Sequence, residues 1–194
     1  DAVAQPHRPA KGAAKVEAGG SQTIIAGGIQ IQGGLTSAAR ASLLAVGDMV
    51  LSTLDGPLQV LGGAAGAAEI DPPVLSAVSN GSILIDGGAA STATATVVAG
   101  LIDMTATNGN MAVIGGGAPA TVTSGSTFAL QASGNLTIAP NAGGAAINAP
   151  GGLNIALRGN CFGCTVNALI GTPLTITEGP PIVDILSDQL VNGL

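Results

Sequence analysis

The sequence predicts an all-β protein built as a parallel β-solenoid, and three observations lead to that prediction. The first is composition: the 194 residues include 31 glycines, 46% hydrophobic residues, no Trp or Tyr, and only Phe128 and Phe162 as aromatic residues. Ordinary globular cores take much of their buried area from aromatic side chains, so small aliphatic ones suit a thin core of near-identical layers. The second observation is the recurrence of short alternating apolar runs, and the third is the turn residues between them.

These runs recur at intervals typical of a solenoid. A turn residue and a glycine precede an alternating apolar run at Gly81, Gly109, Gly134 and Gly151, which are 28, 25 and 17 residues apart. Periods of about 20–30 residues predict coils that each contribute two or three short strands. Each strand pairs with its equivalent in the next coil, about 4.8 Å away. About seven to nine coils would account for most of the chain.

Residues 1–20 predict an extended N-terminal arm. They have no apolar periodicity, and Pro6 and Pro9 favour an extended backbone. We expect such an arm to become ordered against its own body or a neighbouring subunit, by strand addition at an open sheet edge. The arm residues expected at a subunit contact are Val3, Pro6, Arg8, Pro9, Lys11, Lys15 and Val16.

Residues 21–180 predict the solenoid body. The segment 38–46 fits either a helical turn or a strand, and a strand is favoured because its neighbours are strands. The segment 64–79 breaks the rhythm, and its Asp-Pro-Pro sequence predicts an inserted loop or a corner. The other expected strands are 23–25, 29–32, 49–51, 58–61, 83–85, 94–98, 101–104, 111–114, 121–123, 128–130, 136–138, 146–147, 153–157, 166–170 and 174–177.

Residues 181–194 predict a short C-terminal cap or tail. A helix here would place Ile182, Leu186 and Leu190 on one face, where it would cover the open end of the solenoid. An extended tail that joins the next subunit is the alternative. The residues expected at this contact are Ile182, Val183, Ile185, Leu186 and Leu190.

Charge excludes some partners and suggests another. The net charge of −6 argues against a nucleic-acid surface, which needs a basic patch. No apolar run reaches the length of about 20 residues that a membrane span needs. Arg8, Lys11 and Lys15 make the start basic, while the rest is mostly acidic. These ends either attract each other between neighbouring subunits or are simply solvated.

The first residue is Asp1, as expected of an exported protein whose leader has been removed.

Catalytic, cofactor and metal sites are not predicted. Cys161 and Cys164 suit a local disulfide in an oxidising compartment; a disulfide between subunits is the next reading, and redox or metal chemistry the last. His7 is the only histidine, so one chain cannot supply the four Cys or His ligands of a zinc site. Its place in the Pro-flanked arm argues against a Ser-His-Asp triad, which needs the base beside the nucleophile. Asp86 and Asp103 fall in different coils, without aromatic partners for a sugar. We expect both to be solvated.

Three T-x-T phrases offer an alternative reading, as a ligand surface. They lie at 92–96, 121–123 and 175–177. Threonines stacked in register would form a flat face of the kind that binds ice. The uneven spacing favours ordinary outward threonines on strands, where their β propensity is high.

Two longer stretches carry a family resemblance. GDMVLSTLDGPLQVLGG (47–63) and GSTFALQASGNLTIAPNAGGAAINAPGGLNIAL (125–157) resemble the repeats of filamentous-haemagglutinin-type exoproteins. The resemblance implies a right-handed parallel β-helix exported to the cell surface, with roles in adhesion and biofilm.

These observations lead to three functional hypotheses. We expect a non-enzymatic structural subunit of a secreted homopolymeric filament or biofilm-matrix fibre, which assembles with itself by stacking of solenoid ends or exchange of terminal arms. The alternative is a monomeric β-helical adhesin fragment that binds a surface glycan or another host ligand. A β-helix lyase or hydrolase is the third hypothesis. Such an enzyme needs a charged or aromatic-lined cleft, and this composition has few residues to build one.

Overall fold

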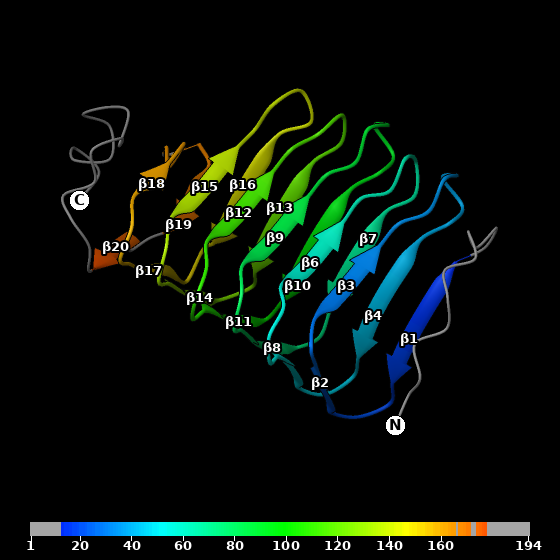
Figure 1. Cartoon of the computed structure of the whole chain (residues 1–194), viewed down its shortest axis with the longest axis horizontal. Coiled ribbons are helices and arrows are strands. Elements are labelled where there is room, and N and C mark those ends of the chain that lie inside the picture. The colour runs from blue at the N-terminus through cyan, green and yellow to red at the C-terminus, as the bar shows by residue number, and fades with distance from the viewer. Residues whose placement is uncertain (1–12, 166, 172–173, 178–194) are drawn as a thin grey trace.

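The protein is a parallel β-solenoid. A computed structural model describes residues 13–165, 167–171 and 174–177, in which twenty strands and no helix occur. Six complete coils are followed by two strands of another. Figure 1 shows the coils stacked along one axis, from β1 at one end to β20 at the other. The predicted fold class is confirmed, and the six complete coils are fewer than the seven to nine expected.

Each complete coil contributes one strand to each of three parallel sheets, called sheets A, B and C. Sheet A contains β1 (Ala14–Ala18), β4 (Ala41–Ala45), β7 (Ala68–Asp71), β10 (Ala95–Ala99), β13 (Ala120–Ser124), β16 (Ala145–Ala149) and β19 (Leu169–Gly171). Sheet B contains β2 (Gln22–Ala26), β5 (Met49–Thr53), β8 (Val74–Ser79), β11 (Leu101–Ala106), β14 (Thr127–Ala132), β17 (Gly152–Leu157) and β20 (Leu174–Thr177). Sheet C contains β3 (Ile29–Gln32), β6 (Leu58–Leu61), β9 (Ile83–Asp86), β12 (Met111–Ile114), β15 (Leu136–Ala139) and β18 (Cys161–Phe162).

An alanine column at the start of sheet A makes the period visible. Ala14 pairs with Ala41, and the pairing continues through Ala68, Ala95, Ala120 and Ala145. The first three steps are 27 residues long and the last two are 25. From Ala41 onward these alanines are buried, so this column is the narrow part of the core. The variation in period is taken up in the turns, which leaves the strand register intact.

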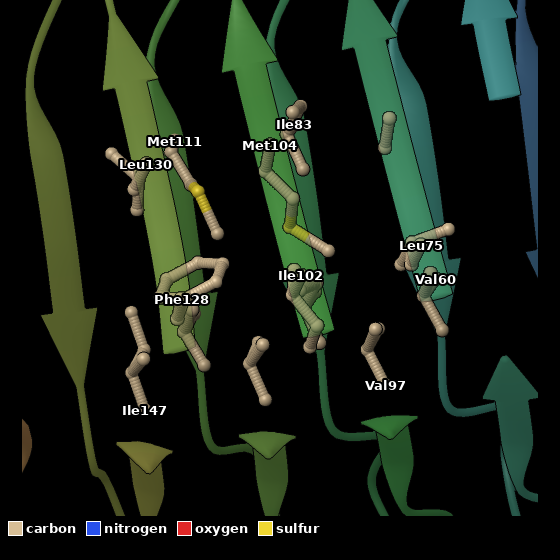
Figure 2. Packing of buried hydrophobic residues seen from close by; sticks show 14 of the residues in the cluster. Val60, Leu75, Ile83, Val97, Ile102, Met104, Met111, Phe128, Leu130 and Ile147 are labelled. Atoms are coloured by element: carbon tan, nitrogen blue, oxygen red, sulfur yellow. The ribbon is translucent and has the colours of Figure 1, made fainter. Parts of the chain in front are cut away.

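Large aliphatic side chains fill the space that the three sheets enclose. In sheet B the inward column runs Met49, Leu75, Ile102, Phe128 and Leu153, each at most 1% exposed. Figure 2 shows side chains from all three sheets together in this interior, among them Val97, Met111 and Phe128. Burial of apolar surface contributes about 25 cal/mol per Å², so this continuous core, shared by all three sheets, stabilises the stack of coils.

Glycines recur at the corners of the coil, and the predicted set of equivalent glycines combines two different corners. Gly134 donates its N–H to the carbonyl of Gly109 at 2.9 Å, and Gly159 donates to Gly134 at 3.0 Å, at the corner between sheets B and C. Gly151 donates instead to Ser126 at 2.8 Å, at the corner between sheets A and B. The predicted set of equivalent glycines was therefore wrong at its last member, and the 17-residue interval is not a coil length.

The structure revises two predicted segment assignments and confirms a third. The segment 64–79 does not break the repeat, because it contains β7 and β8, and Pro72 and Pro73 lie at or beside the corner between them. The segment 38–46 contains a strand, β4, as favoured. The solenoid begins within residues expected to be arm, since β1 pairs with β4 over five residues. The possible cap helix at 181–194 lies outside the described residues.

Candidate functional site

The N-terminal edge of the solenoid is the first candidate site. It is defined here as β1, β2 and β3, which pair with β4, β5 and β6 respectively and with no other described strand. Each of these strands therefore has one side whose main-chain groups are not used by a described neighbour. Such an edge is a template for pairing with another chain.

The core is open at this edge. Val16 is 53% exposed, whereas Leu43, the next residue in its inward column, is 4% exposed. Ile24, Ile29 and Ile31 also point toward the core and are only partly buried. Each inner coil has an apolar layer from a neighbouring coil on both sides. The first coil has such a layer on one side only among the described residues, so an added coil would bury these side chains.

Gln22 adds a polar group to the same edge. It occupies the inward column that continues as Met49 and Leu75. Its side-chain oxygen is buried and has no hydrogen-bond partner among the described residues. A buried polar atom without a partner costs free energy, so a donor that approached this edge would stabilise it.

The outer side of β1 carries a pair of opposite charges. Lys15 Nζ lies 2.7 Å from Glu17 Oε2, and both side chains are about half exposed. A second ion pair joins Arg40, the residue before β4, to Glu69 of β7 at 3.6 Å. Surface ion pairs contribute little to stability, about 0–1 kcal/mol, so their main physical effect is on what approaches the face.

The opposite end of the solenoid has a different shape. β19 and β20 extend sheets A and B by one strand beyond the sixth coil, whereas sheet C ends at β18 among the described residues. Ile170, on the outer face of β19, is 47% exposed. Among the described residues the two ends therefore differ: all three sheets end in the same coil at the N-terminal edge, and the other end is stepped.

Cys161 and Cys164 form a disulfide within the chain. Their Cα atoms are 5.8 Å apart, and both residues are fully buried. Cys161 lies on β18 and pairs with Leu136 of β15, so the bridge closes the last strand of sheet C against the core. The local disulfide is thus the correct one of the three readings of this cysteine pair.

The two candidate carboxylates lie on different faces. Asp86 lies on β9 in sheet C, paired in register with Leu61 and Ile114, and partial burial among its neighbours raises the pKa of its carboxyl above the usual value. Asp103 lies on the outer face of β11 in sheet B. They cannot act as a pair. The described residues contain no group of three or more His, Cys, Asp or Glu side chains placed to hold a metal ion.

The outer faces have shallow grooves and no continuous threonine surface. One groove on sheet B has the polar residues Asp103, Thr127, Asn154 and Thr175 in its lining. A more apolar groove lies at the corner of sheets A and B, beside Pro72 and Pro73. Thr121 and Thr123 are in sheet A, and the phrase at 175–177 lies on β20 in sheet B, so the predicted T-x-T phrases do not share one face.

The predicted contact residues are only partly placed. Lys15 and Val16 lie on β1 at the N-terminal edge. Val3, Pro6, Arg8, Pro9 and Lys11 lie outside the described residues, as do Ile182, Val183, Ile185, Leu186 and Leu190. Sequence reasoning missed the part that β2 and β3 play in this edge. The signal that could have found it is the apolar alternation of residues 22–32, which directly follows the first strand of the repeat and so belongs to the same, outermost coil.

Comparison with known proteins leaves the fold as the main guide to function. No family model, curated protein or solved structure matches the chain. In the described part of the chain, no helix is long and apolar enough to cross a membrane.

Proposed function

We propose that this protein is a structural subunit of an extracellular homopolymeric filament or matrix fibre, joined through the ends of its solenoid. The observation that carries the proposal is the open N-terminal edge, where Val16 is 53% exposed and its column neighbour Leu43 is 4% exposed. Stacking against another end would bury these apolar side chains and pair unused main-chain groups. The part of the arm that precedes β1 and the residues 181–194 are further proposed contacts, by exchange between subunits.

The extracellular location is part of the proposal. The Cys161–Cys164 disulfide supports it, because disulfides persist mainly in oxidising compartments. The role needs no catalytic group and no cofactor, since the joint itself is the function.

Electron microscopy and size-exclusion chromatography of the full chain at neutral pH test the proposal. We expect fibres with a regular subunit repeat. Val16→Glu places a charge in the open core and is expected to shorten or abolish them. Val78→Glu is the matched control: Val78 is 40% exposed on the outer face of β8 in sheet B, two coils from the edge. A chain that stays monomeric at every concentration, or fibres unaffected by Val16→Glu, would contradict the proposal.

A monomeric adhesin is the second candidate, and the polar groove on sheet B favours it. We propose that Asp103, Thr127 and Asn154 would contact a surface glycan there, through side-chain hydrogen bonds. A glycan array tests this alternative. Asn154→Ala should abolish a signal that Asn148→Ala, on the outer face of sheet A, leaves intact. Glycan binding by a chain that never self-associates would replace the filament proposal.

A further inference from the structure

The strand at the N-terminal edge has a self-complementary sequence. β1 reads Ala14, Lys15, Val16, Glu17, Ala18: a small residue at each end, a branched residue in the middle, and opposite charges between. Read in reverse, the strand keeps its pattern of sizes, and the two charges change places. Such a strand matches a second copy of itself running in the opposite direction.

We propose that two copies of this chain join at their N-terminal edges through a two-fold axis at Val16, with β1 antiparallel to β1 of the second copy. This inference rests on the proposed function, because it names the partner and the register of one proposed joint. In this register Val16 lies opposite Val16 of the second copy, and Lys15 lies opposite Glu17. The interface is isologous, so each charge pair occurs twice.

Only one register satisfies both burial and charge. The side chains of Val16, Ala14 and Ala18 face the core side, and a one-residue slip would bring the charged pair to that side. A two-residue slip keeps the faces but pairs Lys15 with Lys15, or Glu17 with Glu17, in the second copy. Like charges directly opposite each other on paired strands destabilise the pair. The centred register alone joins opposite charges.

The rest of the N-terminal edge fits the same axis. A two-fold axis through sheet A exchanges sheets B and C, so β2 of one copy lies along β3 of the other. The partly buried Ile24, Ile29 and Ile31 of both copies then close one continuous core. The buried Gln22 oxygen, which lacks a partner among the described residues, then lies within the joint, on the strand that faces β3 of the second copy.

Head-to-tail stacking fits the described residues less well. Continuing sheet A from β19 into β1 of another copy, in the register by which β16 pairs with β19, would place Glu17 beside Ile170. Ile170 is uncharged, so it cannot form an ion pair with Lys15 or Glu17. Sheet C also ends one coil early at that end among the described residues, so β3 would have no described strand to meet.

Two charge reversals and their mixture test the two-fold register. Lys15→Glu alone gives Glu opposite Glu17 of the second copy, and Glu17→Lys alone gives Lys opposite Lys15. We expect each variant to raise the dissociation constant of the joint roughly tenfold at low ionic strength, measured by analytical ultracentrifugation. Mixed in equal amounts, the two variants form pairs in which all facing charges are opposite. We expect the mixture to associate again, mainly as one-to-one pairs of the two variants.

This mixing experiment separates the joint from the ion pair within β1. Neither single variant has the Lys15–Glu17 pair, so mixing cannot restore it within one chain. Thr121→Glu and Thr123→Lys are the matched controls. They introduce the same two residue types at the same spacing on the outer face of β13, four coils from the edge, and should leave association unchanged alone and mixed.

The outcomes distinguish this inference from the proposed function. Recovery of association in the mixture, lost again in 0.5 M salt, supports the two-fold joint. Assemblies that neither reversal affects, or that both reversals weaken without recovery on mixing, overturn the two-fold register while the filament proposal stands. An unmodified chain that stays monomeric overturns both.

Discussion

Thr53 and Ser79 lie in successive coils, and their hydroxyl oxygens are 3.0 Å apart inside the solenoid. Both residues are at most 3% exposed, and they are two of the three buried polar residues in the described part of the chain. Thr53 also donates to the carbonyl of Gly56 at 2.5 Å, and Ser79 accepts the N–H of Gly81 at 3.2 Å. The two hydroxyls thus satisfy main-chain groups at the corner between sheets B and C, where ladder bonds end.

Thr53→Val should therefore destabilise the protein although it keeps the shape of the side chain. Loss of the hydroxyl leaves the Gly56 carbonyl with one hydrogen bond fewer and disturbs Ser79, so we expect a loss of about 1–3 kcal/mol. Urea denaturation measures this change. Thr105→Val, on the outer face of β11, is the matched control and should alter stability by less than about 0.5 kcal/mol. Equal effects at both sites would show that the buried pair has no special role.

Gly62→Ala should be strongly destabilising because two coils come close at this corner. An added Cβ would overlap the carbonyl oxygen of Ala93 and the N–H of Gly88, both backbone atoms that cannot swing away. Overpacking of this kind costs about 1–3 kcal/mol or more. Gly27→Ala is the control, since a Cβ there meets nothing within 4 Å. Thermal unfolding followed by circular dichroism compares them, and a Gly62→Ala variant as stable as the control would show that the corner can open.

The strands were predictable because each is marked locally by alternation and by a turn. Leu58 to Leu61 and Met111 to Ile114 alternate between inward and outward positions, and both were predicted within a residue of their bounds. The stretch 64–79 was misread because its inward positions include Ala68 and Ala77, whose small side chains give little hydropathy contrast. Its two prolines strengthened the impression of a loop, although they mark a corner.

The candidate site was harder to predict because it depends on which strand lacks a neighbour. Nothing in Ile24 or Ile31 distinguishes an edge strand from an internal one, since both keep the alternation of the buried coils. Only the order of the strands in the three sheets shows that no described strand pairs with the other side of β1, β2 and β3. The local disulfide was the favoured reading, since the short spacing of Cys161 and Cys164 suits such a bridge, and the structure decides it by placing their Cα atoms 5.8 Å apart within one chain.

Asp86→Asn should stabilise the protein at neutral pH. Burial raises the pKa of the Asp86 carboxyl above 3.8, so the folded state binds this proton more tightly than the unfolded state does. The ionised carboxylate therefore opposes folding above the raised pKa, and this penalty disappears as the pH falls through the raised pKa and below 3.8. We expect Asp86→Asn to unfold at higher urea than the unmodified chain at pH 7, with the difference shrinking in acid.

The control for this pH effect is Asp103→Asn, which removes the same charge from the outer face of sheet B. It shows how much of any gain in stability follows simply from removing one negative charge from the chain. Asp86 is the only ionisable residue on the described strands of sheet C, so its effect should depend little on neighbouring titrations. The prediction would be contradicted if the difference in urea midpoint between Asp86→Asn and the unmodified chain grew as the pH falls.

The two phenylalanines should differ sharply in their contribution to stability, because one points inward and the other outward. Phe128 is 1% exposed between Ile102 and Leu153 in its column, whereas Phe162 is half-buried on the outer face of sheet C. Phe128→Ala should cost about 3–5 kcal/mol through lost burial and a cavity that neighbouring coils cannot close. Phe162→Ala, the matched control, should cost about 1 kcal/mol or less. Chemical denaturation of both variants tests this, and similar losses would place Phe128 outside the core.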